Sequence, residues 1–163
     1  FLLPVAVYGI ASSRIVPELA ARGDLTFGTP ALFWLLERLL LPGARVADIS
    51  LHPAARAAWV GAFATALNLL PVGQLDGGHI LYALAGDRHG LLSKVFVAAM
   101  LPLGLFYWPW LLYAVLLFFF GLRHPMVYDE TDLGRERKIL SVTALAMLLL
   151  CFMLAPVQTT AGA

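Results

Sequence analysis

The chain has 163 residues, of which 61% are hydrophobic and only 13% are charged, and its mean hydropathy is +0.84. This composition lies outside the range of ordinary soluble domains and predicts a membrane protein. The formal net charge of +1 gives no basic field for nucleic acid, which argues against a nucleic-acid partner. The single cysteine, Cys151, lies in an apolar run, so this chain alone can build neither an intramolecular disulfide nor a cysteine-based zinc site.

The first apolar stretch, residues 1–13, is too short to cross a bilayer, which takes roughly 20 residues. It has no basic region or small-residue cleavage site of a signal peptide, so we interpret it as the end of a truncated helix. A loop of residues 14–53 follows and contains a short predicted helix at residues 31–41. Because this helix is also too short to span, we expect it to lie at the membrane interface or to re-enter from one side.

The second membrane element, residues 54–85, is predicted to be a broken helix. Pro71 removes a backbone donor and clashes with the preceding turn, and Gly73 follows two residues later, so the regular helix should end near Leu70. A second short helix is expected over residues 79–85. Irregular backbone at membrane depth is tolerated only where protein or a water-filled cavity surrounds it, so this break predicts a site.

The remainder of the chain contains two further apolar runs. Residues 91–121 contain Pro102, Gly104 and an aromatic cluster around Trp108, which favours a helical hairpin with the aromatics at the interface; one long kinked helix is the alternative. Residues 122–138 form a polar loop, and residues 139–157 form the last helix. The predicted fold is therefore all-α, a polytopic transmembrane helical bundle forming a single partial membrane domain over residues 1–163.

Asp76 is the residue in the break that most strongly indicates function. A carboxylate at membrane depth costs several kcal/mol unless it is paired or bound to a cation. The basic residues lie in loops, so a metal that also takes ligands from outside this chain fits well. The structural alternative is that Asp76 caps the second short helix, and the two roles are compatible.

The chain has four histidines. His79, three residues after Asp76, is a candidate fourth metal ligand, but support of Asp76 or a water-facing position in the first turn is favoured, because a catalytic zinc keeps one position open. His52, His89 and His124 lie in predicted loops and are expected to be exposed to solvent.

The pattern Asn68-x-x-Pro71-x-x-x-x-Asp76-Gly77 resembles the Asn-Pro-Asp-Gly signature of site-2 proteases, and the stretch through Gly78 is particularly similar to the bacterial and chloroplast branch. The resemblance extends more loosely to Arg123-His124-Pro125 and the final helix. It implies that Asp76 is the third ligand of a catalytic Zn²⁺. The two histidine ligands and the catalytic glutamate would belong to a His-Glu-x-x-His helix upstream of Phe1, which this chain lacks.

The same resemblance implies roles for the neighbouring residues. Asn68 would hydrogen-bond the substrate backbone or the developing oxyanion. Pro71 and Gly73 would hold the unwound link, and Gly77 and Gly78 would allow the backbone to approach the metal or substrate closely.

The resemblance implies transmembrane-helix substrates and a multi-pass protein of a bacterial inner membrane or a chloroplast membrane. Its partners would be those substrates, the lipid bilayer and the missing N-terminal helices, and the chain alone is expected to be inactive. A non-catalytic membrane adaptor related to the protease is one alternative. An ion-coupled transporter is another, because transporters also build ion sites at broken helices, although no repeat supports it.

Overall fold

The computed structural model of the chain describes residues 1–17, 25–120 and 134–159. These residues are mostly helical, in agreement with the predicted all-α class. The chain divides into two compact units: unit 1 comprises Phe1–Thr65 and Leu150–Ala163, and unit 2 comprises Ala66–Leu149.

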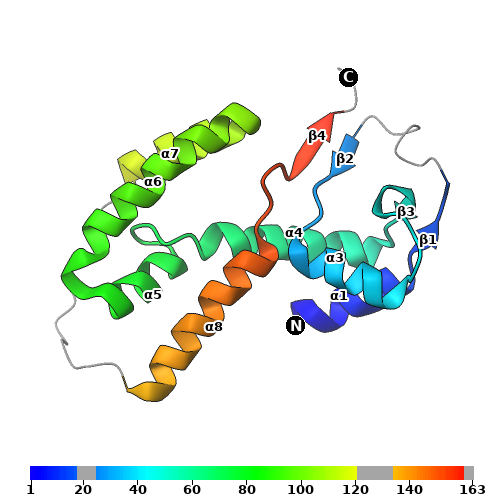
Figure 1. Ribbon diagram of the computed structural model, residues 1–163, viewed down its shortest axis with the longest axis horizontal. Helices are drawn as coiled ribbons and strands as arrows, with labels where there is room; N and C mark the ends of the chain where they lie inside the picture. Colours follow the sequence, from blue (N-terminus) through cyan, green and yellow to red (C-terminus); the bar gives the residue numbers. More distant parts are fainter. Residues whose placement is uncertain (18–24, 121–133, 160–163) are drawn as a thin grey trace. The chain divides into compact units, whose positions relative to one another are not determined.

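The elements shown in Figure 1 follow one another along the chain as helices joined by short strands and single helical turns. Their bounds are α1 (Leu2–Ala11), β1 (Arg14–Ile15), β2 (Leu25–Phe27), α3 (Ala31–Leu40), η1 (Val46–Asp48), β3 (Ile49–Ser50), α4 (Pro53–Asn68), α5 (Asp76–Ala85), η2 (Gly86–Arg88), α6 (His89–Phe106), α7 (Pro109–Phe120), α8 (Arg135–Cys151) and β4 (Val157–Thr159).

Unit 1 is built on the packing of α1 with α3 and with the first part of α4. Ile10 of α1 and Phe33 of α3 are almost completely buried. A Cβ added at Gly9 would overlap the backbone of α4 at Ala55, so a residue without a side chain lets these two helices approach closely. The helix α3 lies where the sequence predicts a short helix.

Two small antiparallel strand pairs in unit 1 were not predicted. β1 pairs with β3, with Arg14 opposite Ser50, and β2 pairs with β4, with Phe27 opposite Val157. The expected loop of residues 14–53 is thus partly paired. Strands of two or three residues are too short to show the alternating pattern by which a strand is predicted, and their partners are distant in the sequence.

The break between α4 and α5 is present. α4 ends at Asn68, slightly before the expected Leu70, and α5 begins at Asp76 rather than His79. A proline disfavours helical backbone at the preceding residue and clashes with the carbonyl four residues earlier. Pro71 therefore ends α4 before Leu70, and residues 69–75 form a non-helical link, which we call the link.

The apolar stretch that begins near residue 91 forms two helices, α6 and α7, which lie side by side in unit 2 (Figure 1). Tyr107 and Trp108 separate them, and Gly104 lies against the Leu111 side chain. This stretch therefore forms two helices rather than one long helix, and the position of the aromatics at a membrane interface stays a prediction. Pro109 begins α7, a position where its missing N–H costs nothing.

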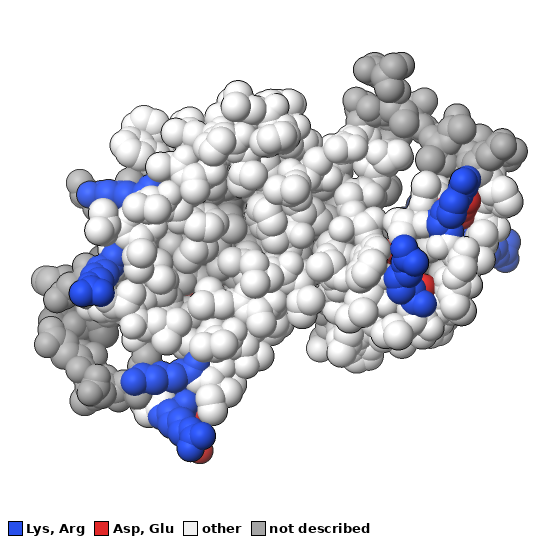
Figure 2. All heavy atoms as spheres, viewed as in Figure 1, with Lys and Arg blue, Asp and Glu red and all other residues white. Residues whose placement is uncertain are grey.

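By length and composition, one helix in the described part of the chain, α6, could cross a membrane; α1 and α7 are apolar but shorter. The polytopic bundle remains a prediction. α8 begins at Arg135 and ends at Cys151, so the last helix is shifted toward the N-terminus relative to the expected 139–157. Figure 2 shows basic side chains at its start and an uncharged surface beyond them. Most of the expected polar loop lies outside the described residues.

Candidate functional site

The link in unit 2 is a pair of tight turns rather than an open loop. The Val72 N–H donates to the Leu70 carbonyl at 2.7 Å, closing a three-residue turn around Pro71. The Leu75 N–H donates to the Val72 carbonyl at 3.2 Å, and Gly73 between them has a φ of 53°, which side-chain-bearing residues rarely adopt. Pro71 and Gly73 therefore lie where the turn geometry favours them.

The N-terminus of α5 lies directly on the link. A Cβ at Gly77 would overlap the carbonyls of Leu69 and Leu70, and one at Gly78 would overlap those of Val72 and Gly73. Both glycines are buried. The close approach seen here is between these glycines and the link, and the expected approach to metal or substrate stays a prediction.

Asn68 and Asp76 flank the link, Asn68 as the last residue of α4 and Asp76 as the first of α5, and both side chains are exposed. The N-cap of α5 is Leu75, and no side chain forms a capping hydrogen bond there. The alternative in which Asp76 caps the helix is therefore wrong. Its carboxylate remains in the first turn, where the helix dipole favours negative charge and where it is open to a further partner.

The donor set in the described residues is incomplete for a metal site. No group of three or more His, Cys, Asp or Glu side chains converges in the described part of the chain. Asp76 offers one carboxylate, and exposed His79 follows one turn later in α5. Cys151 is buried. These residues fit a site in which this chain contributes a single oxygen ligand and other segments contribute the rest.

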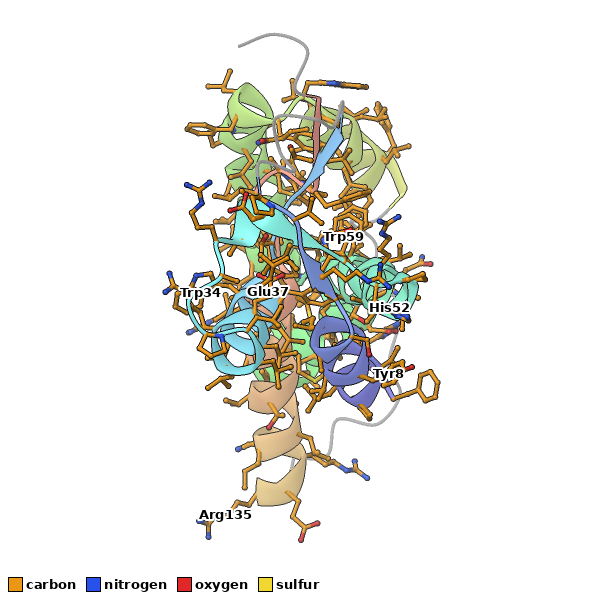
Figure 3. The ribbon with its side chains drawn as sticks, turned by 90° about the vertical axis from the view of Figure 1, so that its right-hand side faces the viewer. Tyr8, Trp34, Glu37, His52, Trp59 and Arg135 are labelled. Atoms are coloured by element: carbon orange, nitrogen blue, oxygen red, sulfur yellow. The ribbon has the colours of Figure 1, made fainter. Side chains whose placement is uncertain are left out.

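The prediction of solvent exposure is wrong for two of the remaining histidines. His52 is partly buried, packs edge-on against Tyr8 at 5.8 Å between ring centroids (Figure 3), and accepts the Ala54 N–H at Nδ1. His89 is only 4% exposed. The sequence suggested a loop around Gly86 and Gly90, whereas α6 already begins at His89 and turns this ring inward. His124 lies outside the described residues.

The burial of the Glu37 carboxyl was not predicted. On α3 in unit 1 (Figure 3), Glu37 is only 5% exposed. Its Oε2 has no hydrogen-bond partner among the described residues. Burial raises the pKa of Glu37 from its ordinary value of 4.5 to about 7, because a carboxylate loses hydration there.

We expect the stability of the intact protein to fall as pH rises from about 4.5 to about 7 on account of Glu37. The folded protein holds this proton more tightly than the unfolded chain, so ionisation costs on the order of 1–3 kcal/mol, fully present above pH 7. Glu37→Gln should remove this component in melting curves recorded from pH 4 to 8. Exposed Glu136→Gln on α8 is the matched control and should leave the pH dependence intact; identical behaviour of the two variants would contradict the prediction.

Comparison with known proteins identifies the class of protein to which this segment belongs. Residues 38–108, which include the link and α5, match the model of Peptidase family M50. The chain therefore carries a segment of this peptidase family, the family of the site-2 proteases, and the predicted resemblance to that family is confirmed.

Three individual proteins are similar in sequence to this chain. The chain is 34% identical over 87% of its length to probable zinc metalloprotease EGY1, chloroplastic, of Arabidopsis thaliana, of which it covers 25%. It is 30% identical over 83% of its length to the protein of the same name from Oryza sativa subsp. japonica, of which it covers 23%. It is also 34% identical over 62% of its length to the DDT domain-containing protein PTM of Arabidopsis thaliana, of which it covers 6%.

The chain thus spans about a quarter of the length of the EGY1 relatives that it matches. No solved structure matches it.

Proposed function

We propose that this chain is part of an intramembrane zinc metalloprotease that hydrolyses peptide bonds within transmembrane helices of membrane-protein substrates. The observation that carries the proposal is the position of the Asp76 carboxylate. It is exposed at the break between α4 and α5 and forms no capping hydrogen bond with the helix. Asp76 lies inside the segment that matches a peptidase family, and the relatives of the chain include proteins named as zinc metalloproteases.

In this proposal Asp76 supplies one oxygen ligand to Zn²⁺, and two histidines from sequence outside this chain supply the others. The bound ion would polarise the scissile carbonyl and lower the pKa of a water molecule. The tight turns at Pro71 and Gly73 fix where α5 starts, and hence where the Asp76 carboxylate lies. His79 supports this carboxylate from one turn along the helix.

Asn68 is proposed to bind the substrate. Its side chain is exposed at the end of α4, across the link from Asp76, and its amide can donate to a peptide carbonyl while accepting from a peptide N–H. A donor near the reacting carbonyl also stabilises the charge that develops on oxygen in the transition state. Asn68 therefore orients the scissile bond, and Asp76 would help to hold the Zn²⁺ that activates the attacking water.

The membrane location is part of the same proposal. We propose a multi-pass protein of a bacterial inner membrane or a chloroplast membrane; α6 is apolar and long enough to span, and the EGY1 relatives are described as chloroplastic. The partners are then the lipid bilayer, the substrate helix and the N-terminal helices of the same protein.

Metal removal from the full-length protein tests the proposal. Reconstituted in liposomes with a transmembrane substrate, the protein should contain about one zinc per chain, lose cleavage when a chelator strips the metal, and regain it when Zn²⁺ is added. A protein that holds no zinc and leaves every substrate intact would instead be the non-catalytic adaptor. Cleavage that is insensitive to complete metal removal would refute the metalloprotease assignment.

A further inference from the structure

Two buried polar residues of α6 connect that helix to the link. Ser93 is fully buried, and its Oγ lies 3.3 Å from the carbonyl oxygen of Pro71 and 3.2 Å from Nε2 of His89. His89 and Ser93 are four residues apart on one face of α6. All of these residues belong to unit 2, so the contacts join α6 to the non-helical segment before α5.

The hydroxyl of Ser93 has a single hydrogen, which determines the direction of this chain of hydrogen bonds. If the hydroxyl donates to the Pro71 carbonyl, its oxygen can accept from His89 only when that imidazole carries a hydrogen on Nε2. The opposite tautomer would draw the hydroxyl hydrogen toward His89 and away from the link. The arrangement that uses both contacts therefore runs from His89 Nε2–H to Ser93 Oγ–H to the Pro71 carbonyl.

The helix break creates the need for this contact. A carbonyl in a continuous helix accepts the N–H four residues later, but here residue 75 donates to Val72 instead. A carbonyl freed at membrane depth needs a donor from within the protein, and Ser93 is that donor. The ring of Tyr82 in α5 packs against His89 with 5.8 Å between centroids. The pair His89 and Ser93 on α6 therefore contacts both α5 and the link.

We propose that His89 and Ser93 are positioning residues that hold the link, and through it Asn68 and Asp76, in the geometry needed for peptide hydrolysis. The inference rests on the proposed protease function, because Asp76 follows the anchored carbonyl by five residues and Asn68 precedes it by three. In this proposal neither residue is a ligand of the metal or binds the substrate. Losing their contacts lets the carboxylate drift from its ligand position without removing any ligand.

The matched pair Ser93→Val and Ser93→Thr tests the hydroxyl in the full-length protein. Both variants add similar volume at the same buried position, but only threonine keeps a hydroxyl. We expect Ser93→Val to lower kcat about tenfold and to weaken zinc binding by about the same factor, as losses of hydrogen-bond support around metal ligands do. Ser93→Thr should stay within about threefold of the wild type in both measurements.

A second pair tests the histidine. His89→Gln keeps an N–H donor near the position of Nε2, whereas His89→Leu removes it. We expect His89→Leu to behave like Ser93→Val and His89→Gln to recover most of the activity. The double variant His89→Leu, Ser93→Val should be no worse than either single change, because both break the same chain of hydrogen bonds.

The outcomes separate this inference from the proposed function. If Asp76→Ala is inactive while Ser93→Val and Ser93→Thr have equal kcat and equal zinc affinity, the positioning role is refuted and the protease assignment stands. If Asp76→Ala keeps wild-type proteolysis, the proposed function itself fails. Should the extra methyl of both Ser93 variants prevent folding, Ser93→Ala removes the hydroxyl without adding volume, and wild-type activity in that variant refutes the inference.

Discussion

Full-length protein carrying Asp76→Ala should lose both its bound zinc and its proteolytic activity. The carboxylate is exposed at the start of α5 and takes no part in capping the helix, so its removal should leave the helix end intact. Loss of supporting residues alone costs about 10–100-fold in metal affinity or activity, and loss of a ligand should exceed the upper end of that range. Zinc content by elemental analysis and cleavage of a reconstituted transmembrane substrate measure the two effects.

Two further variants show whether the effect belongs to the carboxylate. Asp76→Asn keeps the shape and one carbonyl oxygen but loses the negative charge. If zinc binding depends on that charge, the variant should retain less than a tenth of the zinc affinity, which is a loss of about 1.4 kcal/mol or more of binding free energy. Glu136→Ala removes an exposed carboxylate on α8 and should leave zinc and activity unchanged. Full proteolysis by Asp76→Ala would disprove its assigned role.

The helix break could be predicted because Pro71 and Gly73 impose it through local chemistry. A missing donor and a positive φ act within a few residues, so no knowledge of the tertiary fold was needed. The short strands could not be predicted, since residues 14–15 have only their distant partners at 49–50 to stabilise an extended conformation. The bounds of α5 were missed for a related reason: Gly77 and Gly78 are poor helix formers, but their contact with the link stabilises helix there.

The candidate site was only partly predictable. Asn68 and Asp76 could be identified because a polar residue in an apolar segment is costly and therefore conspicuous. His89 could not, because its neighbours Gly86 and Gly90 suggest a turn and the sequence does not show that the ring is buried. The His-x-x-x-Ser spacing at the start of an apolar helix was the one available signal. Pro71 as its partner is visible only in three dimensions.

Gly77→Ala should strongly lower the activity of the full-length protein even though glycine itself takes part in no chemistry. The added methyl would overlap the carbonyls of Leu69 and Leu70, and because these are backbone atoms of a tightly turned link, no side chain can rotate away to make room. Overpacking of this kind costs about 1–3 kcal/mol or more. The link and the start of α5 must move apart, and both Asn68 and Asp76 move with them.

A displacement of reacting groups by about 1 Å can cost roughly 100-fold in rate, so we expect kcat of Gly77→Ala to fall by about that factor. Gly90→Ala is the matched control, because Gly90 lies in α6 with open space where a Cβ would be; it should keep full activity and melt at the same temperature or slightly higher, as alanine favours helix. Equal activity of the two variants would mean that the close approach of α5 to the link is not needed for catalysis. A fall in kcat confined to Gly77→Ala, with the protein still folded, would instead indicate that the rate is lost because the geometry between Asn68 and Asp76 has changed.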